Sequence, residues 1–352
     1  MEMRYLGRTG LRVSSLSFGV MTFGGSRSDF FRAVGETEAE EARRQVDTCL
    51  AAGVNLFDTA DVYSNGASEE ILGQALGTRR SEVILATKLH GLMGGVNDTG
   101  QSRHHIVRAV EASLRRLATD YIDLFQVHGF DERTDLHETL RALDDLVRSG
   151  KVRYIGCSNY SAWHLMKAIG ISEREHLERF AAVQVYYSLV ARELEFDIVP
   201  CCIDQNVGVL VWSPLSGGFL TGKVRRGHAP PEGSRTAAWG PPGGLGNAEG
   251  ALDTVEVLVE IAKARGVTPT QVALNWLLAK PGVTSLILGA RTNDQLEDSL
   301  GAATWSLNDD EIDRLDLVSA VRPPYPHWHQ LKYNSERLSE PWSRSSGAAG
   351  PG

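Results

Sequence analysis

Four side chains that together could carry out acid–base chemistry follow three successive apolar segments of this sequence. Asp58 and Tyr63 stand in NLFDTADVYSNG, Lys88 ends VILATK, and His128 ends IDLFQVH. A tyrosine has an unperturbed pKa of about 10, and a nearby ammonium such as Lys88 favours the phenolate and lowers that pKa. Asp58 could supply the anion that a buried lysine needs, and His128 could hydrogen-bond a carbonyl or join the proton relay. Such a quartet could protonate a carbonyl oxygen while hydride reaches its carbon.

Each of these residues, taken alone, is more simply explained as structural. Asp58 could be a turn residue, Tyr63 a rim aromatic and Lys88 a solvated strand end, while a lone histidine such as His128 is usually a hydrogen-bonded structural one. Their joint position at the ends of three successive strands favours function.

The elements that would position them alternate along the chain. Eight short runs rich in Val, Ile, Leu and Phe predict strands buried on both faces, at 16–19, 55–59, 83–88, 122–128, 154–158, 182–186, 209–212 and 285–289. Amphipathic segments between them predict helices at 38–52, 104–118, 135–149 and 249–265, with another in 266–280 where Thr268 is the N-cap and Pro269 the first helical residue. This order predicts a (β/α)8 TIM barrel whose active site lies at the carboxyl ends of the strands. A doubly wound open sheet is the alternative.

Three further segments complete the predicted architecture. RYLGRTGLRVSSLS has Gly7 and Gly10 around a turn and predicts an N-terminal β-hairpin. Residues 216–250 are rich in Gly and Pro and too long for an ordinary connection, so we expect long loops on the C-terminal face, with this one as a lid. We expect a single barrel domain over 1–335 and a flexible tail over 336–352.

Composition limits the classes of protein. The chain has 352 residues and a formal net charge of −8, and without a Lys/Arg run we expect no nucleic-acid partner. The four cysteines show no CxxC spacing, which is typical of reduced thiols. The segment MEMRYLGRTG has no basic stretch followed by an apolar core, and no run approaches eighteen apolar residues. We therefore expect a soluble cytoplasmic protein with no membrane association.

Several segments resemble the aldo-keto reductase superfamily, in the order and at the spacing of that family. They cover the chain to about residue 320 and read GRTGLRVSSLSFG, FDTADVY, ATK, LFQVH, GKVRYIGCSNY, VQVYYSL, VWSPLSGGFLTGK and LILGARTNDQLEDSLGA. The resemblance implies a barrel that binds NADP(H) without a Rossmann domain. It also implies Asp58, Tyr63, Lys88 and His128 as the catalytic tetrad, with Tyr63 as general acid. Asp61 matches no tetrad position, and we interpret it as a turn residue.

The same resemblance implies a set of cofactor contacts. The nicotinamide end would involve Gly19, Met21, Ser158, Asn159, Gln184 and Trp212, the pyrophosphate loop Ser213, Pro214, Leu215, Gly217, Lys223 and Arg235, and the adenosine end Gly289, Arg291, Gln295, Asp298 and Ser299. Arg291 is the candidate for the 2′-phosphate, because a guanidinium suits a phosphate dianion. The chain departs from the family pattern at Ser299, where Asn is common, and at Val20–Met21, where Thr-Trp is frequent.

The predicted function is the reversible, NADPH-dependent reduction of an aldehyde or ketone to an alcohol. Candidate substrate-lining residues in the rim loops are Phe23, Met93, Phe130 and Trp239. The alternative is a redox-sensing regulatory subunit, because the chain resembles the branch of the superfamily that contains the potassium-channel β subunits.

Other motifs are less informative. GGFLTGKV approaches a phosphate-binding loop, but Val224 stands where the pattern needs a hydroxyl for magnesium. No G-x-G-x-x-G follows a strand and opens a helix, which disfavours a Rossmann dehydrogenase. The pairs His104–His105 and His327–His329 lack a third ligand at recognisable spacing, so we expect solvated histidines and no metal.

Overall fold

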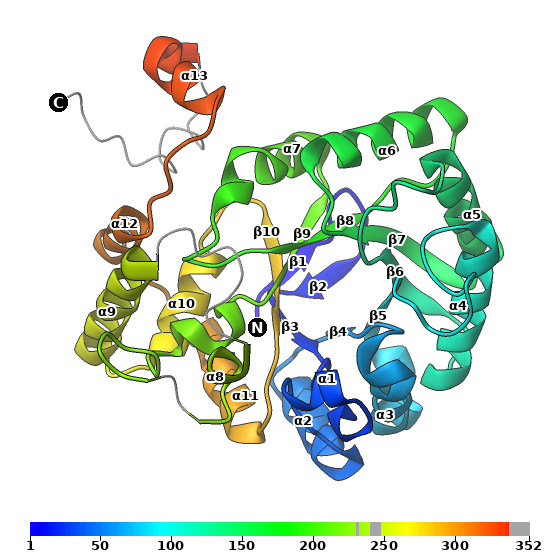
Figure 1. The fold of residues 1–352 in the computed structure, drawn as a ribbon, viewed down its shortest axis with the longest axis horizontal. Coiled ribbons are helices and arrows are strands. Elements are labelled where there is room, and N and C mark those ends of the chain that lie inside the picture. Colours follow the sequence, from blue (N-terminus) through cyan, green and yellow to red (C-terminus); the bar gives the residue numbers. More distant parts are fainter. Residues whose placement is uncertain (230–231, 240–247, 338–352) are drawn as a thin grey trace.

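Eight parallel strands close into a barrel in this computed structural model, which describes residues 1–229, 232–239 and 248–337, except for the side chains of Trp239 and Ala248. The strands pair in the order β10-β3-β4-β5-β6-β7-β8-β9 (Figure 1). Their bounds are β3 Leu16–Gly19, β4 Leu56–Asp58, β5 Ile84–Leu89, β6 Ile122–Val127, β7 Val152–Ser158, β8 Ala182–Tyr186, β9 Gly208–Trp212 and β10 Val283–Leu288. The predicted TIM barrel is confirmed.

The inside of the barrel has an apolar layer below a polar one. Because side chains alternate along a strand, residues two apart share a face. Leu56, Ala86, Leu124 and Ala182 belong to one buried apolar cluster. Two residues further along the same four strands stand Asp58, Lys88, Gln126 and Gln184, all buried. The period of two therefore places four polar side chains together at the carboxyl end of the barrel.

The predicted N-terminal hairpin is present as β1 (Met3–Tyr5) and β2 (Arg12–Ser14), which pair antiparallel. Leu6 and Val13 from this hairpin join the same apolar cluster as the lower barrel layer. The hairpin thus packs against the apolar end of the barrel interior, which leaves the polar end for chemistry.

Helices lie outside the strands (Figure 1). Their bounds are α1 Asp29–Arg32, α2 Ala39–Ala51, α3 Ala67–Leu76, α4 Arg103–Leu117, α5 Leu136–Arg148, α6 Ala162–Glu175, α7 Ile198–Gln205, α8 Arg235–Trp239, α9 Ala248–Arg265, α10 Pro269–Leu278, α11 Asn293–Leu300, α12 Asp309–Val318 and α13 His327–Tyr333. The predicted start of α10 is confirmed, since the Thr268 side chain accepts a hydrogen bond from the backbone N–H of Gln271.

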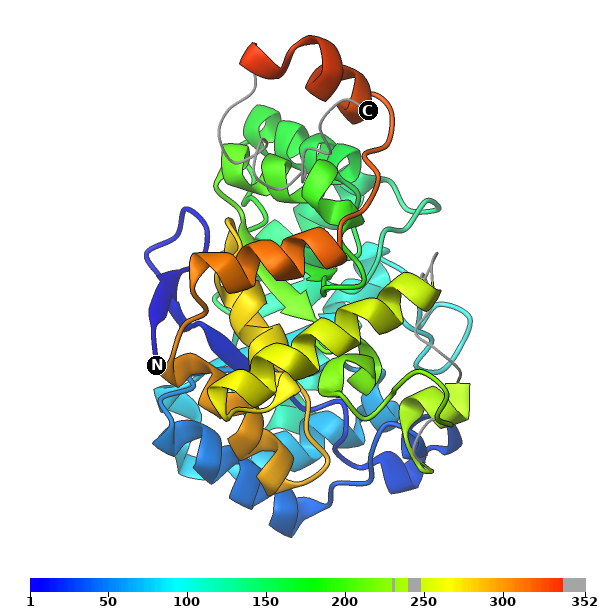
Figure 2. The same cartoon turned by 90° about the vertical axis from the view of Figure 1, so that its left-hand side faces the viewer.

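Outside the barrel, the structure adds elements that the sequence did not predict. The expected lid region contains the 3₁₀ helix η5 (Ser216–Thr221) and α8, while residues 230–231 and 240–247 of it lie outside the described part. Helix α13 lies at the edge of the molecule, away from the strands, in both views (Figure 1 and Figure 2). The predicted tail overlaps the described residues only at 336–337, so its flexibility stays a prediction. Within the described ranges, no helix has the length and apolar character needed to cross a membrane.

Candidate active site

A buried lysine–aspartate pair forms the base of the site. Lys88, on β5, and Asp58, at the end of β4, are 0% and 3% exposed. The Lys88 Nζ donates to Asp58 Oδ1 at 2.5 Å and to the Thr59 carbonyl oxygen at 2.7 Å. A buried ammonium is tolerated only with such partners. The pairing predicted from the sequence is present.

Two glutamines complete the environment of Asp58. Gln184 donates to Asp58 Oδ2 at 2.8 Å and Gln126 donates to the same oxygen at 3.2 Å. Gln184, expected at the nicotinamide carboxamide, thus directs its amide nitrogen to Asp58. Gln126 was missed by the sequence analysis, although a lone amide inside the apolar run IDLFQV was a usable signal. Asp58 is held by three side chains from three other strands.

Tyr63 lies above this pair, at the start of the 3₁₀ helix η2 (Tyr63–Gly66). The Lys88 Nζ is 5.0 Å from the centre of the Tyr63 ring. The His128 ring, directly after β6, is 5.7 Å from the Tyr63 ring at an interplanar angle of 74°. The Phe31 ring packs edge-on against the Tyr63 ring, with the ring centres 5.9 Å apart. The barrel therefore brings all four predicted tetrad residues together.

The site favours a protonated phenol, a charged lysine and a neutral histidine. Burial raises the pKa of Tyr63 above its usual value, and Lys88 only partly opposes that rise. The expectation that Lys88 would bring this pKa down towards neutrality is therefore wrong for this structure, because desolvation outweighs the ammonium. Burial disfavours the Lys88 ammonium, but Asp58 and Tyr63 outweigh it and raise the lysine pKa. Burial, followed by the Lys88 charge, lowers the pKa of His128 to about 3.

A group of side chains predicted for the nicotinamide end surrounds the tetrad. Asn159 follows β7 with φ 56°, and its amide nitrogen donates to the His128 carbonyl oxygen at 2.9 Å. Its Oδ1 accepts from the Trp212 indole nitrogen at 3.2 Å. Ser158, at the end of β7, donates to the Gln184 carbonyl oxygen. Trp212, at the end of β9, stacks on Tyr186 with ring centres 4.7 Å apart. Tyr186 was not identified from the sequence.

Two other residues predicted for the nicotinamide side, Gly19 and Met21, lie at and just after the end of β3. Gly19 ends β3, and a Cβ there would meet the Ile287 Cγ2 at 2.5 Å, so close packing alone requires glycine. Met21 follows it and is half-buried.

The loop after β9 turns back on itself with unusual backbone angles. Ser213 and Gly217 have φ values of 53° and 65°. The Gly217 backbone N–H donates to the Ser213 hydroxyl at 3.0 Å. Pro214 is buried and Leu215 half-buried between them, and Lys223 is exposed beyond the turn. Turns that contain such left-handed residues can point successive backbone N–H groups into one concave site, which suits an anion.

Two arginines stand side by side near this loop. Arg291, after β10 and Gly289, donates to the Val34 carbonyl oxygen at 2.9 Å and to the Gly233 carbonyl oxygen at 2.7 Å. Arg235, at the start of α8, is held by the Val34 carbonyl oxygen at 3.5 Å. Burial, with the nearby Arg291 charge, lowers the pKa of Arg235 to about 10. Among the described residues no carboxylate pairs with either guanidinium, so this positive pair favours an anion.

Comparison with known proteins gives the family. The family model "Aldo/keto reductase family" matches residues 15–320. The chain belongs to the aldo/keto reductase family. It is 39% identical over 327 residues to the Bacillus subtilis (strain 168) protein named "Uncharacterized oxidoreductase YrpG", covering 90% of this chain and 94% of that one. It is 36% identical over 336 residues to "Probable voltage-gated potassium channel subunit beta" of Arabidopsis thaliana, covering 93% and 99%. It is also 33% identical over 354 residues to "Versiconal hemiacetal acetate reductase" of Aspergillus parasiticus, covering 92% and 99%.

In this aldo/keto reductase the residues expected at the adenosine end lie on or beside α11. The Gln295 side chain accepts from the Arg291 backbone N–H at 3.0 Å and so fixes the turn. Ser299 is buried and donates to the Gln295 carbonyl oxygen. The Asp298 carboxylate instead accepts from Thr268 at 2.9 Å and from Gln271 at 3.0 Å, both in the α10 region. Asp298 therefore ties α11 to α10.

The substrate-lining residues predicted from the sequence are scattered. Phe23 is 0% exposed and packs edge-on against Phe18, so it is a core residue. Met93 lines a separate cavity beside α4. Phe130 is half-buried and stacks on His164 with ring centres 3.6 Å apart. The Trp239 side chain lies outside the described residues. The prediction for Phe23 is wrong, because its rim loop turns the side chain into the core. A substrate contact at Met93 or Phe130 stays a prediction.

Proposed function

We propose that this aldo/keto reductase catalyses the reversible, NADPH-dependent reduction of an aldehyde or ketone to an alcohol, with Tyr63 as the general acid. Its family and its oxidoreductase relatives support carbonyl reduction in general. The observation that carries the finer proposal is the placement of Tyr63 between Lys88, at 5.0 Å from the ring centre, and His128, at 5.7 Å between rings.

Each member of the tetrad has a separate task in this proposal. Tyr63, protonated because burial raises its pKa, gives its hydroxyl proton to the carbonyl oxygen. Lys88, fixed by Asp58, favours the phenolate left behind. His128 is neutral and can donate one hydrogen bond that orients the same oxygen. When bound, NADPH supplies the hydride that the carbonyl carbon accepts.

The cofactor preference rests on the two arginines. Arg235 and Arg291 have no carboxylate partner among the described residues, and their proximity lowers the pKa of Arg235 to about 10. A phosphate dianion would relieve that repulsion, and a guanidinium binds phosphate in a fixed geometry. The residues present therefore fit NADP(H), with Arg235 and Arg291 at the 2′-phosphate.

Replacing Arg291 by methionine tests this preference. A hydrogen bond to a charged group contributes about 1.5–3 kcal/mol, so we expect KM for NADPH to rise about 10- to 100-fold while KM for NADH stays unchanged. Initial rates with both cofactors measure the effect. An equal loss with both would contradict a 2′-phosphate contact.

The acid is tested by Tyr63→Phe. Purified protein should oxidise NADPH in the presence of a reactive aldehyde such as 4-nitrobenzaldehyde, followed by absorbance. We expect the variant to lose roughly 10²- to 10⁴-fold in kcat, the usual contribution of a general acid. NADPH affinity, measured by fluorescence, should be retained. Undiminished turnover in the variant would show that Tyr63 is not the general acid.

A second candidate function is a cofactor-sensing regulatory subunit. It is favoured by the 36% identity to a protein named as a potassium-channel subunit. Slow turnover limited by release of oxidised cofactor, together with a partner that co-purifies, would support it, whereas rapid multiple turnover would support the reductase. A cytoplasmic location fits both and stays a prediction.

A further inference from the structure

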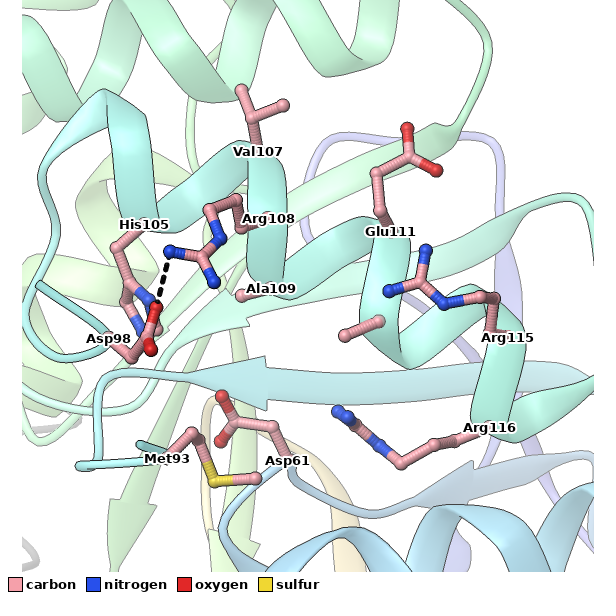
Figure 3. Close-up of a pocket in the computed structure, with 11 residues that line it drawn as sticks. Asp61, Met93, Asp98, His105, Val107, Arg108, Ala109, Glu111, Arg115 and Arg116 are labelled. Atoms are coloured by element: carbon pink, nitrogen blue, oxygen red, sulfur yellow. Dashed lines mark ion pairs between the residues drawn. The ribbon is translucent and has the colours of Figure 1, made fainter. Parts of the chain in front are cut away.

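A cavity of about 360 Å³ lies outside the barrel, beside α4 and separate from the tetrad. Figure 3 shows it between the loop that follows β4 and one side of α4. The residues that matter for its chemistry are Asp61, Met93, His105, Arg108, Ala112 and Arg116.

Two buried polar side chains line this cavity without a well-formed hydrogen bond. Asp61 is 1% exposed, and among the described residues neither of its carboxylate oxygens has a partner at ordinary hydrogen-bond geometry, although the adjacent Val62 backbone N–H supports its charge weakly. In Figure 3 its carboxylate points towards α4. His105 is 3% exposed, and neither of its ring nitrogens has a partner among the described residues. Buried polar groups are nearly always satisfied, so both point to an occupant with hydrogen-bond donors.

This placement adds to one sequence-based interpretation and corrects another. Asp61 is a turn residue, as expected, and the turn also buries its carboxylate beside α4. His105 was expected to be solvated at a helix start, but α4 packs it inside. The sequence contained no signal for either, because both depend on how α4 packs against the loop after β4.

Of the three arginines that line the cavity, Arg115 is exposed, and Arg108 and Arg116 are paired with other carboxylates. Arg108 contacts Asp98 at 2.9 Å, and the Arg116 Nε donates to Glu69 Oε2 at 2.6 Å. Their positive charge is therefore largely committed to other carboxylates, and neither donates to Asp61. The Asp61 carboxylate is left as a buried acceptor facing the cavity.

We propose that this cavity binds a small primary amine in its ammonium form, with the ammonium on the Asp61 carboxylate. An ammonium carries three donors, and Asp61 and His105 offer acceptors in the same cavity. Met93 and Ala112 supply apolar surface for a short alkyl group. A divalent cation would need several oxygen ligands, whereas the other carboxylates that line the cavity, Asp98 and Glu111, are paired with Arg108 and Lys151. The proposal does not rest on the reductase function.

The charge of Asp61 links this binding to pH. Burial, with the Glu69 charge, raises the pKa of Asp61 to about 7, while Arg116 and Lys88 oppose the rise. The other titratable residues that line the cavity are Asp98, His105, Arg108, Glu111 and Arg115. Only the ionised carboxylate attracts an ammonium, so the affinity for the amine should fall about tenfold per pH unit below pH 7 and level off above it.

Calorimetric titration of the full chain with n-butylamine tests the proposal, with n-butanol as the neutral probe of the same shape. An alkylammonium, like the lysine side chain, stays charged between pH 6 and 8. We expect saturable one-to-one binding of butylamine at pH 8, about tenfold weaker binding at pH 6, and no binding of butanol. Absence of saturable binding at pH 8, or equal binding of butanol, would overturn the proposal.

Variants distinguish an effect of the Asp61 carboxylate on binding from an effect of misfolding. Asp61→Asn keeps the size of the side chain and should weaken binding at least tenfold, while the exposed Asp145→Asn should leave it unchanged. Ala112→Phe should also abolish binding by filling the cavity with Asp61 intact, which keeps the test valid if Asp61→Asn folds poorly. Circular dichroism confirms folding of each. Wild-type affinity in either folded cavity variant would contradict the assignment.

Discussion

Asp58, the last residue of β4, and Asp61, in the loop that follows, are three residues apart and both buried, yet their surroundings differ completely. Asp58 accepts from Lys88 at 2.5 Å, from Gln184 at 2.8 Å and from Gln126 at 3.2 Å. Among the described residues the Asp61 carboxylate has no partner at ordinary hydrogen-bond geometry, and the Val62 backbone N–H supports its charge only weakly. Strand β4 directs Asp58 into the polar layer of the barrel, and the loop after it directs Asp61 towards α4.

The difference shows that burial alone does not define the role of a carboxylate. Burying an unpaired charge costs far more than burying a paired one. Asp58 is held by partners from three strands and in turn holds Lys88 beside Tyr63. Asp61 is buried without an ion-pair partner, and burial raises its pKa to about 7. The first is suited to fixing a charge and the second to responding to protons or to a cation.

The largest effect is expected when Asp58 loses its ion-pair partner and becomes, like Asp61, a buried carboxylate without a cation beside it. Lys88→Met leaves the Asp58 carboxylate buried without its cation. Removing one partner of a buried pair costs about 3–5 kcal/mol, so we expect the free energy of unfolding to fall by that amount, and kcat to fall by at least roughly 10²-fold. Urea denaturation and NADPH oxidation measure the two effects.

A lysine in a more exposed pair provides the control. Lys151 pairs with Glu111 near the surface, and such pairs contribute about 0–1 kcal/mol. Lys151→Met should therefore change stability little and leave kcat unchanged. Equal effects of the two substitutions would show that the buried pair has no special importance.

A smaller effect is expected at Asp61, as a dependence of stability on pH. The pKa of Asp61 is about 7 in the folded protein, against an ordinary value of 3.8. Between these values the folded state binds more protons than the unfolded chain, so ionisation of Asp61 lowers stability as pH rises, by up to about 1.4 kcal/mol per pH unit. Asp61→Asn should lack this contribution, so the difference in unfolding free energy between variant and wild type should grow in favour of the variant from pH 4 to pH 7.

Chemical denaturation across this range measures that difference. Asp145→Asn, at an exposed site, should run parallel to the wild type. A difference between Asp61→Asn and wild type that stays constant with pH would mean that Asp61 does not titrate as its surroundings indicate.

The sequence was sufficient to predict the barrel and the grouping of Asp58, Tyr63, Lys88 and His128 at its carboxyl end. Strands buried on both faces read as continuous apolar runs, and a polar residue at the end of such a run falls on the active rim of a barrel. That reasoning found Asp58, Lys88 and His128, and the helix start at Thr268 followed from local capping chemistry.

Features that depend on tertiary packing were not predictable in the same way. Gln126 reaches Asp58 only because β4 and β6, the two neighbours of β5 in the barrel, both direct side chains of the same layer into its interior. Phe23 is core and Met93 lines another cavity, since a loop sequence does not say which way its side chains turn. The rise in the Tyr63 pKa follows from how deeply the fold buries the phenol, and the Asp61 cavity arises from the packing of α4.

The most direct test of this account compares kcat for NADPH-dependent reduction of 4-nitrobenzaldehyde in Asp58→Asn and Asp61→Asn. Both substitutions replace a buried carboxyl group by an amide of nearly the same size, and the two positions are three residues apart. We predict that Asp58→Asn lowers kcat by at least roughly 10²-fold, because Lys88 loses the carboxylate that fixes it beside Tyr63, and that Asp61→Asn keeps the wild-type kcat. Equal losses in the two variants, or a larger loss in Asp61→Asn, would contradict the assignment of the chemistry to the Asp58 side of the loop.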